Sequence, residues 1–189
     1  MARGDRSASD QKLMARVRDG SVAAFQALYE RHHRALFNFL LRFLADRPTA
    51  EDLLQEAFLR VYIHRESYRP TAAFRTWLFT IARNLAFDHL RRSGTVRESA
   101  GEEDRVAAMP DPSPSPLRRV EAGEDLRQLE AALRQLPPGQ QEVLLLSRYA
   151  GLSHAEIAQL TERSPEAVRV ALHRALSRLG DLLRAPPSE

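Results

Sequence analysis

GLSHAEIAQLTERSPEAVRVALHRALSRL, residues 151–179, is the stretch that decides the fold of the second half of the chain. Ser153 and Glu156 have the spacing of a capping box, which begins a short helix. After a polar turn, Ser164 and Pro165 begin a longer helix, because serine caps helices and proline fits their first position. A short helix, a tight turn and a longer helix predict a helix-turn-helix, whose second helix enters the major groove of DNA.

The longer helix has an apolar side and a polar side. At helical spacing the predicted buried stripe consists of Val168, Ala171, Leu172, Ala175, Leu176 and Leu179. Arg169 and His173 are the predicted readers of base edges, and Arg174 is a predicted phosphate contact. An ordinary surface residue is the alternative for His173. The predicted DNA-binding set of this helix is Ser164, Glu166, Arg169, Val170, His173 and Arg174.

A second informative stretch is AEDLLQEAFLRVY, residues 50–62. At about 100° per residue, one side of this helix carries Leu54, Ala57, Phe58 and Val61. The opposite side carries Asp52, Gln55, Glu56 and Leu59. A leucine among acidic and amide groups is typical of a docking surface, where the polar groups fix the register of a partner helix. A solvated helix face is the alternative.

A third stretch, FRTWLFTIARNLAFDHLRR, spans residues 74–92 and has a net charge of +3. Its predicted buried stripe is Phe74, Trp77, Leu78, Ile81, Leu85 and Leu90. Its other side combines basic, hydroxyl, amide and aromatic groups, which suits single-stranded nucleic acid. Tyr68, in the preceding loop, is predicted to contact an unpaired base. The predicted set is therefore Tyr68, Arg75, Thr76, Thr80, Arg83 and Asn84.

The remaining pattern predicts an all-α fold of two small helical domains. Apolar spacing between residues 11 and 44 predicts two helices with a break at 19–21, and Thr49 is the expected N-cap of the third helix. Four helices form a domain over residues 1–93. Residues 94–123 are rich in proline and acidic groups and predict an extended linker. Residues 124–189 form a second domain, in which two further helices precede the helix-turn-helix.

Composition excludes several classes of protein. The 189 residues contain no cysteine, so disulfides, thiolate metal sites and cysteine nucleophiles are excluded. The sequence has no long apolar run, so we expect a soluble, cytoplasmic protein without membrane insertion. His32 and His33 have no acidic residues at metal-ligand spacing, and no phosphate-binding glycine loop is present. We therefore expect no metal, no cofactor and no enzymatic activity.

Taken together, the three stretches resemble bacterial sigma factors of the extracytoplasmic function (ECF) group in the sigma-70 family. The likeness covers about residues 11–93 and 125–184. It implies a sigma2-like first domain and a sigma4-like second domain, in a factor that gives RNA polymerase its promoter specificity.

The resemblance also implies partners. Asp52, Gln55 and Glu56 would dock on the β′ clamp helices of core RNA polymerase, and the β flap would be a second contact. The helix over residues 74–92 would recognise and open the promoter −10 element, with a flipped base near Tyr68 and Asn84. The last helix would read the −35 element. Release from an inhibitory anti-sigma factor is a common control in the family, so such a factor is a candidate partner.

The chain departs from the family pattern in its last helix. Glu166-Ala167 replaces the Gly-Thr pair of many members, and Val170-Ala171 replaces a common Ser-Arg pair. The helix thereby lacks an arginine at an expected base-reading position, so its −35 preference does not transfer from relatives.

Two other functions remain open on sequence grounds. A DNA-binding regulator of the response-regulator type would use the helix-turn-helix alone, but it needs a receiver with alternating strands. A decoy or adaptor protein would tolerate charge reversal at Arg83 and Arg169.

Overall fold

The computed structural model describes residues 9–69, 73–94 and 124–184, and within these ranges the chain forms helices and no strand. The N-terminal unit, residues 9–94, consists of α1 (Asp10–Arg18), α2 (Val22–Leu44), α3 (Arg47–Ile63) and α4 (Phe74–Arg92). The C-terminal unit, residues 124–184, consists of α5 (Glu124–Arg134), α6 (Pro138–Leu145), the π-helix η1 (Leu146–Ala150), α7 (His154–Thr161) and α8 (Pro165–Arg184). The predicted all-α class is confirmed. Apart from Gly94, the predicted linker over 94–123 lies outside the described residues.

Side-chain caps define where the first helices begin. The hydroxyl of Ser21 accepts a hydrogen bond from the backbone N–H of Ala24 at 3.3 Å, which starts α2 after the predicted break. The prediction that Thr49 caps α3 is wrong. Asp46 is the N-cap, and its carboxylate accepts from the backbone N–H of Thr49 at 2.9 Å. The acceptor comes three residues earlier than predicted because Pro48 lies in the first turn of the helix, where its missing N–H costs nothing.

Aromatic side chains fill the core between α2 and α4. The Phe39 ring stacks parallel to Phe43 at 5.7 Å between centroids and meets Phe79 edge-on at 5.5 Å. Leu78 is fully buried beside them. The buried stripe of α4 differs from the predicted one, because Phe79, Ala82 and Ala86 are buried while Trp77, Ile81 and Leu90 are partly exposed. The helix is rotated relative to the prediction because α2, α3 and the C-terminal unit all pack against it.

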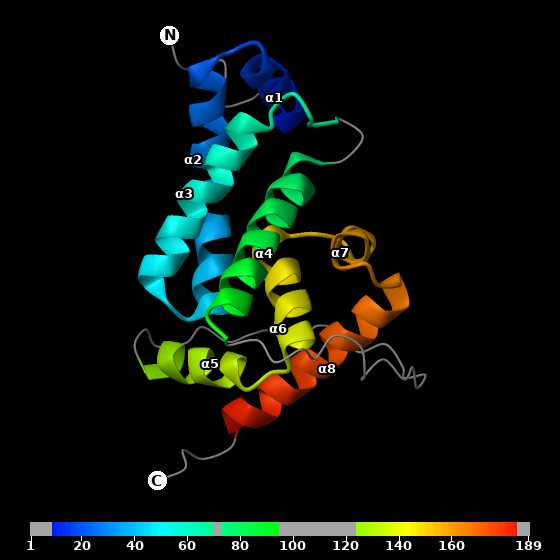
Figure 1. Ribbon diagram of the computed structural model, residues 1–189. Coiled ribbons are helices and arrows are strands. Elements are labelled where there is room, and N and C mark those ends of the chain that lie inside the picture. Colours follow the sequence, from blue (N-terminus) through cyan, green and yellow to red (C-terminus); the bar gives the residue numbers. More distant parts are fainter. Residues whose placement is uncertain (1–8, 70–72, 95–123, 185–189) are drawn as a thin grey trace.

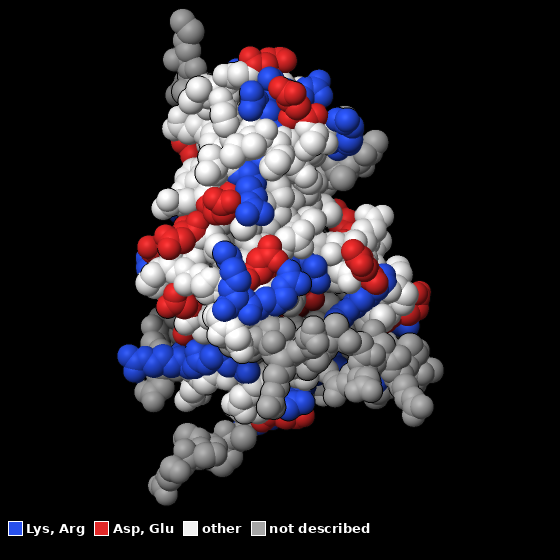
Figure 2. Space-filling view, viewed as in Figure 1, with Lys and Arg blue, Asp and Glu red and all other residues white. Residues whose placement is uncertain are grey.

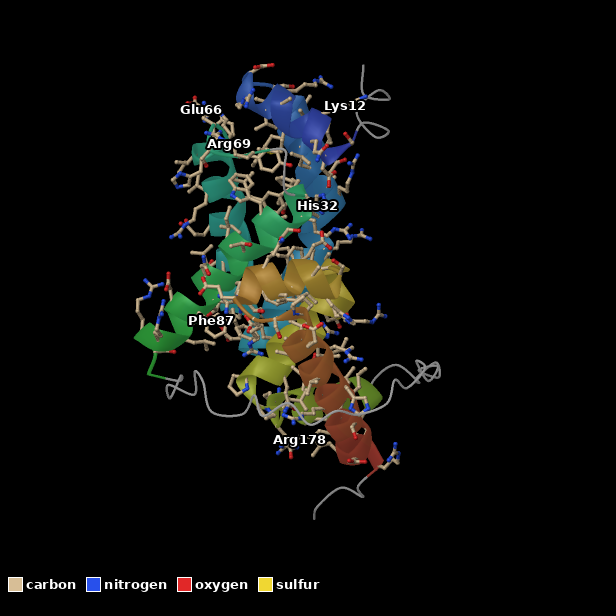
Figure 3. The ribbon with its side chains drawn as sticks, turned by 90° about the vertical axis from the view of Figure 1, so that its right-hand side faces the viewer. Lys12, His32, Glu66, Arg69, Phe87 and Arg178 are labelled. Carbon is tan, nitrogen blue, oxygen red and sulfur yellow. The ribbon has the colours of Figure 1, made fainter. Side chains whose placement is uncertain are left out.

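A buried polar contact fastens α1 to α2. The His32 side chain, 1% exposed, contacts the Asp10 carboxylate at 2.8 Å, and Arg31 donates to the same carboxylate. Burial of the Asp10 carboxyl would raise its pKa, but hydrogen bonds and charge from His32 and Arg31 outweigh burial and lower it. Figure 3 shows His32 in the half of the molecule nearer α1, far from Arg178 on α8. We interpret the contact as structural, since it holds α1 against α2 at one end of the N-terminal unit.

The C-terminal unit contains one irregular helix. The predicted helix around 143–149 is α6 followed directly by η1, and it ends at Gly151 in the left-handed conformation, with φ 58°. The π-helix inserts extra residues into the turn, and such turns occur frequently at functional sites. Here η1 packs against α2 and α4 of the N-terminal unit. Figure 1 shows α4 between the N-terminal helices and α6, so α4, together with α2, joins the two halves.

Candidate nucleic-acid and partner-binding surfaces

The α3 face, defined as Asp52, Gln55, Glu56 and Leu59, lies where the sequence predicted it. Asp52 and Gln55 are exposed, Glu56 is partly exposed, and Leu59 is 51% exposed. The Glu56 carboxylate accepts from the Arg60 guanidinium at 2.7 Å, which holds it in place along the helix. The opposite side of α3 is buried, as predicted, through Leu54, Ala57, Phe58 and Val61.

The α3 face extends further than the prediction. Ile63 is 56% exposed and follows Leu59 by four residues, so both lie on the same side of the helix. Tyr62 is also exposed, and its ring meets Phe25 of α2 edge-on at 5.5 Å. The same helical spacing that identified Leu59 would have identified Ile63. Large exposed apolar groups beside carboxylates are typical of protein interfaces.

The α4 face, defined as Arg75, Thr76, Thr80, Arg83 and Asn84, is brought together on one helix as predicted. It is partly covered, because Arg75 and Asn84 are exposed while the other three residues are partly buried. Arg75 donates to the backbone carbonyl of Ala150 at 3.1 Å, and the Thr76 hydroxyl donates to Glu156 at 3.2 Å. Thr80 donates to the carbonyl of Thr76 at 2.8 Å, within the helix. Asn84 remains exposed.

Within the α4 face, Arg83 makes the contact with the most buried partner. Its guanidinium forms an ion pair with Glu142 of α6, whose side chain is only 2% exposed. The same guanidinium lies over the Phe87 ring at 4.7 Å, and Figure 3 shows Phe87 toward the lower end of α4. A carboxylate this buried requires a cationic partner, because an unpaired charge in the interior is costly.

Tyr68, which was predicted to contact an unpaired base, is buried in this structure. Tyr68 is 5% exposed, and its ring packs against Trp77 at 5.2 Å and Phe74 at 6.2 Å. Burial, followed by the nearby Asp10 charge, raises the pKa of its hydroxyl. The loop position suggested exposure, but the apolar start of α4 offers the ring a place to pack. Trp77, predicted to be in the core, is only partly buried.

The helix-turn-helix has the predicted boundaries. The Ser153 hydroxyl accepts from the Glu156 backbone N–H at 3.3 Å, and Glu156 accepts from the Ser153 backbone N–H at 2.8 Å. Hydrogen bonds from the Ser153 side chain and backbone lower the pKa of Glu156. Glu162 adopts the left-handed conformation that ends α7, with φ 59°. Ser164 then accepts from the Ala167 backbone N–H at 3.1 Å and begins α8.

The α8 face, the predicted DNA-binding set, is open to solvent at its N-terminal end. The exposed members are Ser164, Glu166 and Arg169, whereas Val170, His173 and Arg174 are partly buried. The predicted buried stripe of α8 is confirmed at Val168, Ala171, Ala175 and Leu179. Leu176 was predicted to be in this stripe and is 51% exposed, although Ala175 before it and Leu179 after it are buried, so Leu176 lies outside the packed side of α8.

The departures at positions 166–167 and 170–171 fall on different sides of α8. Ala167 and Ala171 are buried and face the core, while Glu166 is exposed and Val170 partly exposed. The expected loss of a base-reading arginine at position 171 is therefore unsupported, since this position does not face solvent. Glu166 and Val170 are the two departures that a groove could meet.

Other kinds of site are absent from the part of the chain described here. Those residues contain no cluster of three His, Asp or Glu side chains that could hold a metal ion. No helix in the same ranges is long and apolar enough to cross a membrane.

Comparison with known proteins agrees with this geometry. Residues 28–95 match the family Sigma-70 region 2, and residues 126–179 match Sigma-70, region 4. RNA polymerase sigma factor CarQ of Myxococcus xanthus is 40% identical over 173 residues, covering 90% of this chain and 95% of CarQ. ECF RNA polymerase sigma factor SigL of Mycobacterium tuberculosis is 37% identical over 88% of this chain and 94% of its own.

A solved structure shares the arrangement of the whole chain. CnrH, in complex with the cytosolic domain of CnrY, superposes with a TM-score of 0.71 and 26% identity, covering 94% of this chain and 99% of CnrH. Two region matches in order, together with relatives aligned over nearly their full length, settle the family. The chain belongs to the ECF group of RNA polymerase sigma factors in the sigma-70 family.

Proposed function

We propose that the three faces divide the work of a sigma factor, with the α3 face binding polymerase, the α4 face binding the −10 element and the α8 face reading the −35 element. Members of this family are transcription initiation factors and not enzymes, and their partners are core RNA polymerase and promoter DNA. The observation that carries the proposal is the exposed α3 face, in which Leu59 and Ile63 share a helix with the polar groups of Asp52, Gln55 and Glu56 inside the Sigma-70 region 2 match.

The α3 face would dock on the β′ clamp helices of the core enzyme. Leu59 and Ile63 supply apolar area that a partner can bury, and Asp52 and Gln55 supply polar groups that fix the register. The β flap would provide a second contact, to the C-terminal unit. A factor that makes these contacts would act in the bacterial cytoplasm, where transcription occurs.

The α4 face would hold the single-stranded −10 element. Arg75 and Arg83 supply guanidinium groups for phosphates, and Asn84 supplies an amide that can hydrogen-bond to a base edge. Because Tyr68 is packed under Trp77, it would take part in base capture only after a local rearrangement. Arg75, Arg83 and Asn84 are therefore the principal candidates in this structure.

The α8 face would read the −35 element as duplex. Arg169 is exposed one turn into the helix, where a residue of a recognition helix reaches base edges. The exposed Glu166 beside it would disfavour phosphates and favour a cytosine amino group, so we expect a −35 preference unlike that of relatives with glycine there.

An anti-sigma factor is a further proposed partner. CnrH is similar to this chain along its whole length and was solved in complex with the cytosolic domain of CnrY. The sigma factor RpoE of Bartonella quintana, solved with the anti-sigma factor NepR, shares the fold with a TM-score of 0.68 and 24% identity, covering 88% of this chain and all of RpoE. The exposed apolar part of the α3 face is a candidate contact.

Reconstitution with core RNA polymerase tests the proposal. The purified chain should form a complex with core enzyme and direct transcription from a defined set of promoters, which sequencing of transcripts made on genomic DNA would identify. Another ECF sigma factor serves as the positive control. Failure to bind core under conditions in which the control binds would contradict the proposal.

A promoter reporter then separates a sigma factor from an adaptor. Charge reversal at Arg169 should abolish transcription from the promoters found, whereas charge reversal at the exposed Arg184 should not. An adaptor that does not contact DNA would keep full function in both variants.

A further inference from the structure

The C-terminal unit occupies hydrogen-bonding groups of the α4 face. Arg75 donates to the carbonyl of Ala150 at the end of η1, Thr76 donates to Glu156 of α7, and Arg83 pairs with Glu142 of α6. Three of the five residues in the α4 face are therefore bound by groups of the C-terminal unit. Figure 2 shows blue and red groups side by side across the middle of the molecule, where α4 meets the C-terminal helices in Figure 1.

The covering groups have the chemistry of the proposed ligand. A DNA phosphate would present anionic oxygens to the arginines and hydroxyls of α4. In the structure, carboxylate oxygens of Glu142 and Glu156 and one backbone carbonyl take these donors instead. DNA and the C-terminal unit thus compete for the same hydrogen-bond donors, and both cannot occupy Arg83 at once.

Polar contacts from α2 complete the junction. Gln141 donates to the backbone carbonyl of Arg42 at 3.1 Å, and the Arg42 guanidinium lies over the Tyr149 ring at 5.2 Å. These polar contacts lie beside a hydrophobic cluster that includes buried residues of both units, so the junction is only partly polar. Interfaces between domains of one chain are commonly of this mixed kind. The buried Arg83–Glu142 pair is also suited to a reversible contact, because the cost of desolvating both charges offsets much of their attraction.

We propose that this junction is an autoinhibitory latch, in which Glu142 and Glu156 act as intramolecular substitutes for DNA phosphates. In the closed arrangement the donors of Arg75, Thr76 and Arg83 are occupied, and they become available when the C-terminal unit moves away. The latch rests on the proposed DNA-binding role of the α4 face. Glu156 also belongs to the capping box of α7, so altering it would affect both the helix and the junction. Glu142 pairs with Arg83, so its substitution is the easier one to interpret.

The test measures closure and DNA binding on the same full-length protein. Because the chain has no cysteine, Ala23→Cys on α2 and Ser177→Cys on α8 give two exposed labelling sites for a dye pair. Single-molecule energy transfer reports the separation of the units. Fluorescence anisotropy with a fluorescein-labelled, mixed-sequence single-stranded DNA of about 25 nucleotides reports binding through the positive groups of α4.

Glu142→Gln keeps the shape of the side chain and removes its charge. We expect a larger population of widely separated units and tighter binding of the DNA probe, by up to about tenfold if the open form rises from a tenth of molecules to nearly all. Gln141→Ala, which weakens a different contact in the junction, should move both readouts in the same direction by less. Asp181→Asn, which neutralises an exposed carboxylate on α8, should change neither readout.

The two readouts separate failure of the latch from failure of the proposed function. If dye separation is unchanged in Glu142→Gln and Gln141→Ala while both variants keep their helical circular dichroism, the latch is overturned. If the units separate but the DNA affinity of both variants equals that of the unaltered chain, the DNA-binding role of the α4 face is overturned. The proposal that the C-terminal unit blocks DNA binding is then overturned as well.

Discussion

The α3 face and the α4 face belong to the same unit, yet one is open to solvent and the other is partly covered by the C-terminal unit. Leu59 and Ile63 on α3 are more than half exposed, whereas Arg83 on α4 is tied to a carboxylate that is 2% exposed. On the proposed assignments, the surface that meets polymerase is ready in the closed arrangement and the surface that meets DNA is not. Binding to core enzyme can therefore precede opening, which would keep the free protein from occupying DNA.

The two faces also differ in chemistry. The α3 face relies on apolar area, whose exposure to water in the monomer costs free energy that burial by a partner recovers. The α4 face relies on cations, which bind any suitably placed anion, including carboxylates of their own chain. A charged surface is therefore the easier of the two to block by contacts within the same chain.

Charge reversal on the α4 face should give the largest effect. Arg83→Glu would place two carboxylates together in the junction, and breaking such a pair disfavours the closed arrangement by about 3–5 kcal/mol. The same change repels DNA phosphates. We expect open units and transcription reduced by roughly 10- to 100-fold, because like charges at an interface cost several kcal/mol.

This variant sharpens the contrast with Glu142→Gln, which should open the units and strengthen DNA binding. Dye separation and run-off transcription on reconstituted holoenzyme check both variants. Arg184→Glu, at an exposed ion pair on α8, is the matched charge-reversal control. Arg83→Glu with unaltered transcription would remove Arg83 from the DNA-binding face.

Truncation on the α3 face should have an intermediate effect, confined to polymerase binding. Leu59→Ala should weaken the affinity for core enzyme by about tenfold, equal to about 1.4 kcal/mol, because an apolar anchor in an interface is lost. Stability should change by less than about 0.5 kcal/mol, because the side chain is half exposed. Leu183→Ala, an exposed leucine at the end of α8, is the control. Equal core affinity for Leu59→Ala and the unaltered chain would show that the α3 face is solvated.

The sequence predicted the helices well because their signals are local. Ser153 and Glu156 form the capping box as predicted, and Ser164 begins α8 as predicted. The prediction failed at Thr49, where Asp46 three residues earlier offered an equally local acceptor. The apolar run that precedes Tyr149 gave no sign of a π-helix, because an inserted turn does not change which residue types are buried.

The contacts that cover the α4 face lay beyond sequence reasoning. Arg83 and Glu142 are 59 positions apart, and Thr76 and Glu156 are 80 apart. At those separations an arginine and a carboxylate are indistinguishable from solvated surface groups, since no periodicity connects them. The burial of Tyr68 was missed for a related reason, because it depends on the contact between its ring and that of Trp77 in the folded chain.

The smallest predicted effect concerns the helix-turn-helix and its dependence on pH. The capping box lowers the pKa of Glu156 below its usual 4.5, so its stabilising contribution is present above that pH and is lost as the pH falls through the lowered pKa. Ser153→Ala should lower stability by about 1 kcal/mol at pH 7. The difference in stability between Ser153→Ala and the unaltered chain should narrow as the pH falls below 4.5 and through the lowered pKa of Glu156, because its carboxylate then becomes protonated.

Denaturant unfolding at pH 7 and pH 3.5 measures that gap. Ser21→Ala is the control, because Ser21 caps α2 through the Ala24 N–H with no carboxylate in the contact. Its cost should be similar at both pH values, since no titrating group takes part. If the cost of Ser153→Ala also stays constant between pH 7 and pH 3.5, the Glu156 carboxylate does not contribute to the cap, and its hydrogen bond to Thr76 becomes its main role at the junction with α4.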